Sequence, residues 1–179
     1  MRSCLPALLF ALALASPLPV AAAEPQVAAV TGLPAPKLAL AGCAARRVLL
    51  INLYDLRLYL PQRASATAAF DPNLPRALEL SVTYPGNVPG RMPEHWRQRL
   101  DRRLPPALIA DLDRMYQNLR GGDVVLLEYR PDRGTRLRLN GTVQMADHGP
   151  ALMDTLVELW MGPQAVYPDV RHQLLSGRC

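Results

Sequence analysis

The feature that most constrains the fold is a run of short strand-like segments separated by tight turns in the second half of the chain. Residues 124–129, 136–139 and 142–146 are dense in Val and Leu or alternate between apolar and polar residues. Pro-Asp-Arg-Gly at 131–134 joins the first two, and Asn140-Gly141, a strong hairpin signal, joins the last two. A parallel pair needs a crossover of a dozen or more residues, so these connections predict an antiparallel meander.

The rest of the chain supplies earlier strands and several helices. The sequence becomes strand-like at Lys37, and apolar density with partial alternation predicts one strand over 47–60 and another over 77–84. Apolar residues at helical spacing predict helices over residues 94–104, 107–119, 149–161 and 169–175. This order of elements predicts an α+β domain, in which helices are laid on an antiparallel sheet, rather than a doubly wound fold.

The N-terminus has the three-part order of a cleavable secretory signal peptide. Arg2 is followed by an apolar core at 5–15 and by three alanines at 21–23, as a signal peptidase site requires. Two prolines interrupt the apolar run, and neither it nor any later stretch reaches the about 20 apolar residues of a membrane span. We therefore predict a periplasmic protein with no membrane span after cleavage, divided into a signal peptide (1–23), a flexible leader (24–36) and one domain (37–179).

Export leaves two cysteines, Cys43 and Cys179, at the two ends of the predicted domain. An even pair in an oxidising compartment is compatible with one disulfide that closes nearly the whole chain. Two separate thiols are the alternative, because sequence does not give the Cα separation that a disulfide requires. Both states stay open at this point.

The charge of the chain does not indicate a nucleic-acid partner. The formal net charge is +5, and removal of the signal peptide, whose only charged residue is Arg2, leaves +4. The basic residues are spread among acids and match no RNA- or DNA-binding motif, so we expect no nucleic-acid binding. The sequence does not indicate which protein, if any, is a partner.

The residues of common catalytic centres are sparse and scattered. No serine after the signal peptide lies in a Gly-x-Ser-x-Gly motif, and the histidines have no metal-ligand spacing, so we expect no metal site and no cofactor. The residues concerned are Ser65, Ser81, Ser176, His95, His148 and His172. Asp154 and Glu158 lie one turn apart on the polar side of a predicted helix, and we interpret them as a solvated face.

Several short motifs, in the right order over about residues 37–177, resemble the chalcone-isomerase-like family. The first is Gly42-Cys-Ala-Ala-Arg46, followed by Leu53-Tyr54 and Leu58-Tyr59-Leu60; the later ones are Gly121-Gly122-Asp123, Gly134-Thr135, Asn140-Gly141, Leu159-Trp160-Met161-Gly162 and Leu174-Leu175-Ser176-Gly177. The resemblance implies an α+β open-faced β-sandwich in which helices cover a large antiparallel sheet and frame an apolar cleft. The family includes plant isomerases, fatty-acid-binding relatives and exported bacterial proteins.

The isomerases use an Arg near the end of the first strand together with a hydroxyl network. Arg46 matches that Arg, the strand Thr falls on Tyr54, and the late Ser or Thr falls on Leu159, which has no hydroxyl. The family's helix Tyr and Asn are not placed within 93–119. We therefore expect that any catalytic role belongs to Arg46 and that the hydroxyl network of the isomerases is not retained.

An Arg beside an apolar cleft also suits a carboxylate ligand, because a guanidinium can donate two parallel hydrogen bonds to it. Our first hypothesis is a non-catalytic binder of a small apolar carboxylate, such as a fatty acid, held by Arg46, Tyr54, Tyr59 and Leu159. The alternatives are an isomerase acting on an unsaturated carbonyl compound and an envelope interaction module.

Two reservations concern the geometry of this proposed site. Arg46 could instead pair with an acid while the tyrosines pack within the sheet. In addition, a straight strand would separate Arg46 from Tyr54 by about 26 Å, so the two residues can share a ligand only if a turn or bulge intervenes.

Overall fold

The computed structural model describes residues 37–88 and 90–179, which form one six-stranded antiparallel sheet, four α-helices and a short 3₁₀ helix. The strands are β1 (Leu38–Val48), β2 (Ile51–Pro61), β3 (Arg76–Val82), β4 (Val124–Arg130), β5 (Gly134–Leu139) and β6 (Thr142–Asp147). Each strand pairs with the next along the chain, which confirms the predicted α+β class and the antiparallel meander. The predicted signal peptide (1–23) and leader (24–36) lie outside the described residues.

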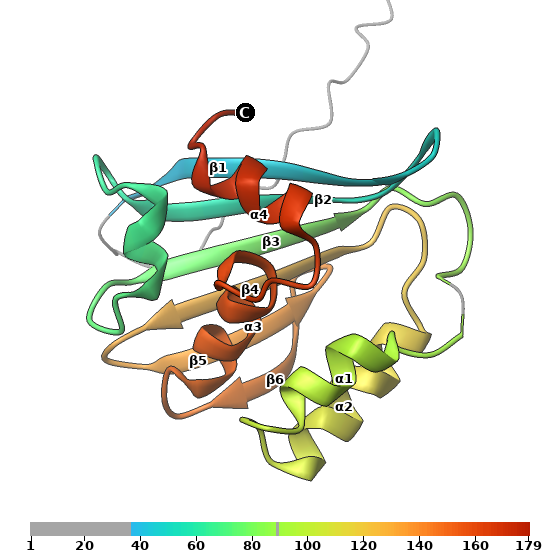
Figure 1. Ribbon diagram of the computed structural model, residues 1–179. Helices are drawn as coiled ribbons and strands as arrows, with labels where there is room; N and C mark the ends of the chain where they lie inside the picture. The colour runs from blue at the N-terminus through green and yellow to red at the C-terminus, as the bar shows by residue number, and fades with distance from the viewer. Residues whose placement is uncertain (1–36, 89) are drawn as a thin grey trace, which may run out of the picture. The chain divides into compact units, whose positions relative to one another are not determined.

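The helices lie against one face of the sheet (Figure 1). They are α1 (Glu94–Leu100), α2 (Pro106–Gln117), α3 (Ala151–Met161) and α4 (Pro168–Leu175), and the 3₁₀ helix η1 covers Ala66–Phe70. The helix predicted to reach residue 104 ends at Leu100, and residues 101–104 form turns that lead to Pro105. Within the described part of the chain, no helix combines the length and hydropathy needed to cross a membrane.

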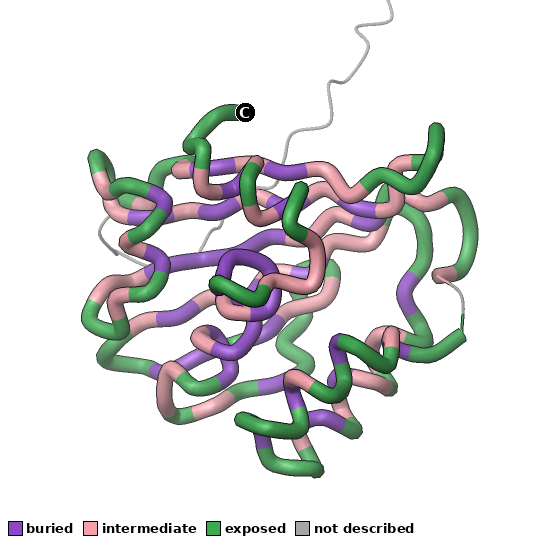
Figure 2. Tube along the Cα trace, viewed as in Figure 1, coloured by how far each residue is buried: buried purple, intermediate pink, exposed green. Residues whose placement is uncertain are grey.

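The two faces of the sheet differ in chemistry. On the helix side, Leu56, Leu58 and Leu60 of β2 are fully buried, and buried residues concentrate under the helices (Figure 2). The opposite face carries charged cross-strand pairs, such as Arg57 with Glu79 at 2.8 Å. This alternation of buried and polar side chains along each strand is the pattern of a sheet with one solvated face.

The strand predicted over 47–60 is wrong, because the chain reverses within it. β1 ends at Val48 and β2 begins at Ile51, with Leu49 and Leu50 forming the turn. Leu49 adopts a φ of 54°, the left-handed region that Gly, Asn and Asp normally occupy in tight hairpins. The sequence therefore lacked the residues by which such a turn is recognised.

The C-terminal segment covers the outer edge of β1. Cys43 and Cys179 form a disulfide, which is one of the two states that the sequence left open. The backbone N–H of Ala45 donates to Gln173 Oε1 at 3.0 Å, and Gln173 Nε2 donates back to the Ala45 carbonyl at 3.4 Å. These bonds occupy backbone groups that an edge strand would otherwise leave unpaired.

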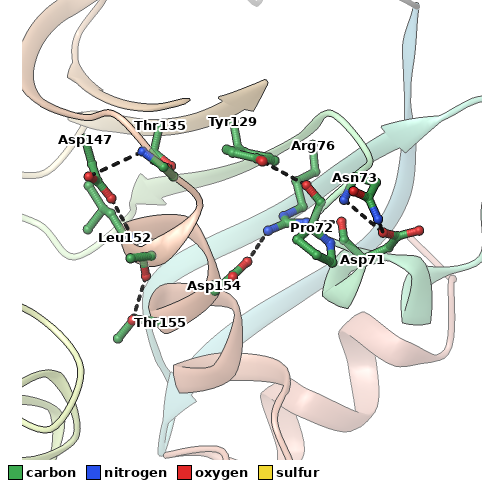
Figure 3. A network of polar contacts seen from close by, with 12 residues as sticks. Asp71, Pro72, Asn73, Arg76, Tyr129, Thr135, Asp147, Leu152, Asp154 and Thr155 are labelled. Carbon is green, nitrogen blue, oxygen red and sulfur yellow. Dashed lines mark hydrogen bonds and ion pairs between the residues drawn. The ribbon is translucent and has the colours of Figure 1, made fainter. Parts of the chain in front are cut away.

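A buried ion pair joins the sheet to α3 (Figure 3). Arg76 of β3 is fully buried and donates to Asp154 and to the Asp71 carbonyl, and its guanidinium carbon lies 4.7 Å from the centre of the Tyr129 ring. The interpretation of Asp154 as part of a solvated face is only partly right, because its side chain is 38% exposed but its carboxylate is bound by the buried Arg76. The periodicity of α3 places Asp154 on the polar side of the helix. Only the packing of α3 on β3 brings Arg76 beneath Asp154.

Candidate functional site

A small apolar pocket lies between the helix side of the sheet and the helices. Its volume is about 200 Å³. Leu80 and Leu127 contribute to its floor, and Trp96 of α1, Leu112 of α2 and Leu159 of α3 line the helix side. Pockets for drug-sized ligands measure about 300–1,000 Å³, so this pocket suits a smaller molecule.

Most of the aromatic residues of the chain gather in this pocket. It is lined by both tryptophans and four of the six tyrosines, namely Tyr54, Tyr84, Trp96, Tyr116, Trp160 and Tyr167. Trp96 is the centre of the group, with edge-to-face contacts to Trp160 at 5.4 Å, Tyr116 at 6.0 Å, Tyr167 at 6.2 Å and Tyr54 at 6.3 Å between ring centroids. Such mutual contacts hold the rings in defined orientations.

The β1–β2 hairpin brings Arg46 and Tyr54 together. The two residues are direct cross-strand partners, and such partners project from the same face of a sheet. Because the chain reverses at Leu49 and Leu50, Arg46 and Tyr54 are not held far apart as they would be in one straight strand. Leu53 is an extra residue of β2 at this point, because Arg46 pairs with Tyr54 and Arg47 with Asn52, and Leu53 and Tyr54 both line the pocket.

Arg46 lies beside the pocket, against Tyr167. Its guanidinium carbon is 4.0 Å from the centre of the Tyr167 ring, and its Nη1 donates to Asp169 Oδ2 at 3.4 Å. Asp169 is about half exposed, and the contact is long and single, so this ion pair is weak. The Nε of Arg46 is buried and has no acceptor within the described residues. Arg46 is therefore paired with an acid, yet it keeps donor capacity.

Two further donors lie in the pocket wall. The Trp160 indole donates to Tyr54 Oη at 3.3 Å, so the phenol of Tyr54 uses its oxygen as an acceptor and its own O–H stays available. Burial raises the pKa of Tyr54 well above its usual value of about 10, against weaker lowering by the Trp160 hydrogen bond and by the charge of Arg46. The indole Nε1 of Trp96 is buried and has no acceptor among the described residues.

The other two predicted site residues have different positions. Leu159 is buried and lines the pocket. Tyr59 does not, because it lies on the opposite face of the sheet near Glu79 and Arg57. The five-residue spacing between Tyr54 and Tyr59 already indicates opposite faces of a strand, and the sequence reasoning did not use it.

The structure adds residues that the sequence reasoning missed as site residues. Trp96, Tyr116 and Tyr167 line the pocket, and Tyr116 of α2 is a tyrosine from the helical segment in which no family position was assigned. Burial raises the pKa of Tyr116. Asn118, at the end of the same helix, is exposed and bonds the Arg114 carbonyl instead. One sequence feature could have identified these residues: the few aromatic residues of the chain are concentrated on strands and helices that face the same core.

The pocket wall offers donors but little acid–base chemistry. Among the residues that line it, tyrosines are the only titratable ones; no His, Asp, Glu or Lys is present. Across the described residues, no group of three His, Cys, Asp or Glu side chains is placed to hold a metal ion. The arrangement can hold an apolar body and donate hydrogen bonds to an acceptor on it.

Comparisons with known proteins assign the chain to a family. The model of the chalcone isomerase-like family matches residues 21–176. The chain belongs to the chalcone isomerase-like family. Thirty-five chains of solved structures match significantly, among them a fatty-acid binding protein of Arabidopsis thaliana, with 12% identity, a TM-score of 0.56 and coverage of 77% of this chain and 86% of that one. This likeness shows the chalcone isomerase-like fold. No curated protein sequence matches significantly.

Proposed function

We propose that this chalcone isomerase-like protein binds a small apolar carboxylate, such as a short fatty acid, without converting it. The observation that carries the proposal is an apolar pocket whose wall supplies hydrogen-bond donors and no carboxylate. Tyr54 and Trp96 lie in its wall, Arg46 lies beside it, and no acid lines it. A carboxylate is an acceptor-only group, and its alkyl or aryl body matches the apolar wall.

The weak Asp169 contact supports a role for Arg46 in this binding. A ligand carboxylate that forms two parallel hydrogen bonds with the guanidinium outcompetes a single 3.4 Å contact to an exposed acid. The structural neighbour from Arabidopsis thaliana, a fatty-acid binding protein, is consistent with this ligand class. The signal peptide predicted at 1–23 adds that the ligand is one met in the periplasm.

Calorimetric titration with octanoate tests the proposal. We expect saturable binding of octanoate and much weaker binding of octanol, which has the same chain without the charge. Arg46→Ala should weaken octanoate binding by about tenfold to a hundredfold, the range for loss of a charge-assisted hydrogen bond. Arg47→Ala is the matched control, because Arg47 is exposed, whereas its neighbour Arg46 lies over the ring of the lining residue Tyr167. Equal loss in both variants, or no octanoate binding, contradicts the proposal.

One observation favours the second candidate, an isomerase of an unsaturated carbonyl compound: Arg46, at the position of the isomerases' Arg, lies directly across from the hydroxyl-bearing Tyr54. A chalcone cyclisation assay of the wild type and Arg46→Ala distinguishes the two functions, and mass spectrometry of a lipid extract identifies any acid that co-purifies. Turnover that disappears in Arg46→Ala would replace the binding-only proposal with the isomerase.

A further inference from the structure

The tip of the β1–β2 hairpin, Val48–Ile51, is the most exposed apolar segment of the described chain. Leu49 is 94% exposed and Leu50 is 100% exposed, with Val48 and Ile51 close to half exposed on either side. The other exposed large apolar side chains of the described residues, Leu40, Phe70 and Val143, are isolated from one another in sequence. Single exposed apolar residues are ordinary on protein surfaces, whereas a contiguous group is a sign of an interaction site.

The hairpin tip projects beyond the sheet. β2 pairs with β3 from Tyr54 onward, and the Leu53 carbonyl accepts hydrogen bonds from the backbone N–H groups of Thr83 and Tyr84 just beyond β3. The tip at Val48–Ile51 extends past this last contact and past the end of the adjoining strand (Figure 1). Leu49 also occupies a left-handed conformation, which is unfavourable for a leucine because its Cβ comes too close to the following carbonyl oxygen. Leu49 and Leu50 bury almost nothing in return, so folding does not account for them.

The charged residues next to the hairpin tip indicate which kind of surface the tip binds. The hairpin carries three arginines, Arg46, Arg47 and Arg57, against one acid, Asp55, and the charged residue nearest the tip is the exposed Arg47. A second copy of the chain would bring the same cationic segment against this one across a two-fold axis. An anionic phospholipid surface matches both properties, because its acyl region accepts the leucines and its headgroups attract arginine.

The tip also adjoins the pocket. Leu53 and Tyr54, which line the pocket, follow the tip in β2, and the Leu53 carbonyl accepts a 3.1 Å hydrogen bond from the backbone N–H of Tyr84, another lining residue. Leu53, Tyr84 and Val88 are half-buried and form a pocket edge on this side. We propose that the hairpin tip inserts into the headgroup–acyl boundary of an anionic bilayer, with this pocket edge turned to the lipid. Transfer of a ligand from the bilayer into the pocket rests on the proposed function, whereas docking of the hairpin tip on the bilayer does not depend on it.

Vesicle co-sedimentation tests the docking. The double variant Leu49→Asn/Leu50→Ser removes the apolar tip, and Asn suits the left-handed position, so its stability should equal or exceed that of the wild type. Binding to vesicles of phosphatidylethanolamine and phosphatidylglycerol should fall at least about tenfold in this variant. Phe70→Ser, which removes an exposed apolar side chain from η1, should bind as the wild type does. All three chains carry the same residues 1–36, so any contribution of that segment cancels.

Direct insertion has its own readout. In Leu50→Trp, the fluorescence of the new tryptophan should shift to the blue with anionic vesicles and should be quenched by brominated acyl chains, because the side chain enters a dry environment. Failure of the wild type to bind anionic vesicles, or equal binding by the double variant, overturns docking. A dimer in sedimentation velocity that the double variant dissociates, without vesicle binding, identifies a second copy as the occupant and also overturns it.

The docking and the proposed function fail independently. Octanoate in solution needs no bilayer, so its affinity should be the same in the wild type and in Leu49→Asn/Leu50→Ser. If the wild type binds vesicles but not octanoate, the docking proposal stands and the proposed function is contradicted. If it binds octanoate but not vesicles, only the docking proposal is contradicted.

Discussion

Asp169 competes with the proposed ligand for Arg46. Because its carboxylate both contacts Nη1 and repels an incoming anion, Asp169→Asn should strengthen octanoate binding by about 1.5-fold to fivefold, the scale of one partly exposed ion pair. Calorimetric titration measures the change. Asp132→Asn, at an exposed acid paired with Arg130, is the matched control and should leave the affinity unchanged. Unchanged affinity in Asp169→Asn would show that the ligand does not reach Arg46.

Tyr54 makes stability sensitive to alkaline pH. Its pKa is raised in the folded protein, chiefly by burial, so the folded state holds the proton more tightly than the unfolded state does. The stabilisation is complete below the unfolded value of about 10 and is lost as pH rises from there toward the folded pKa. Urea unfolding from pH 8 to 11 should therefore show a steeper loss of stability above pH 10 in the wild type than in Tyr54→Phe. Parallel profiles would contradict this account.

Removing one partner of the Arg76–Asp154 pair should destabilise the protein strongly, whereas replacing both partners with apolar residues should change its stability little. Burial lowers the pKa of Arg76 and raises that of Asp154, so desolvation outweighs the attraction in both groups. Arg76→Met alone should reduce the free energy of unfolding by about 2–4 kcal/mol, somewhat below the range for fully buried pairs because Asp154 is partly exposed. Arg76→Met/Asp154→Leu should recover most of that loss in chemical denaturation. A double variant no more stable than the single one would contradict the prediction.

At the scale of elements, the disulfide ties α4 to β1. Cys43 and Cys179 are 136 residues apart in sequence, so the bridge constrains most of the unfolded chain. Cys43→Ser/Cys179→Ser should lower the free energy of unfolding by up to about 4–5 kcal/mol in the chain-entropy model, measured by guanidinium denaturation. Amide exchange should accelerate most in α4, whose Gln173 bonds to β1 depend on the same docking. Uniform acceleration over all helices would contradict this local role.

At the scale of the whole molecule, the pocket is the space that sheet and helices leave between them. Val125 lines it, whereas its neighbour Val124 points to the opposite face of β4. Val125→Phe should abolish octanoate binding and change the free energy of unfolding by less than about 3 kcal/mol, because the added ring enters existing space. Val124→Phe should leave binding unchanged in the same titration. Undiminished binding in Val125→Phe would place the ligand outside the pocket.

The sequence by itself determined the features that depend on neighbours along the chain. The turns at 131–134 and Asn140-Gly141 specify antiparallel pairing through their length and chemistry, and helical spacing located α2, α3 and α4 to within two residues. The order of short motifs was sufficient to indicate the family. These signals are local, because backbone conformation responds to residues a few positions away.

Tertiary structure alone decided the site. The turn at Leu49 and the extra residue Leu53 set the register that joins Arg46 to Tyr54, and neither carries a recognisable turn or bulge signal. Trp96 and Tyr167 reach the same pocket from segments about 70 residues apart, and their convergence depends on how helices pack on the sheet. Packing brings distant residues together according to the shape of the whole core, and no local pattern records that shape.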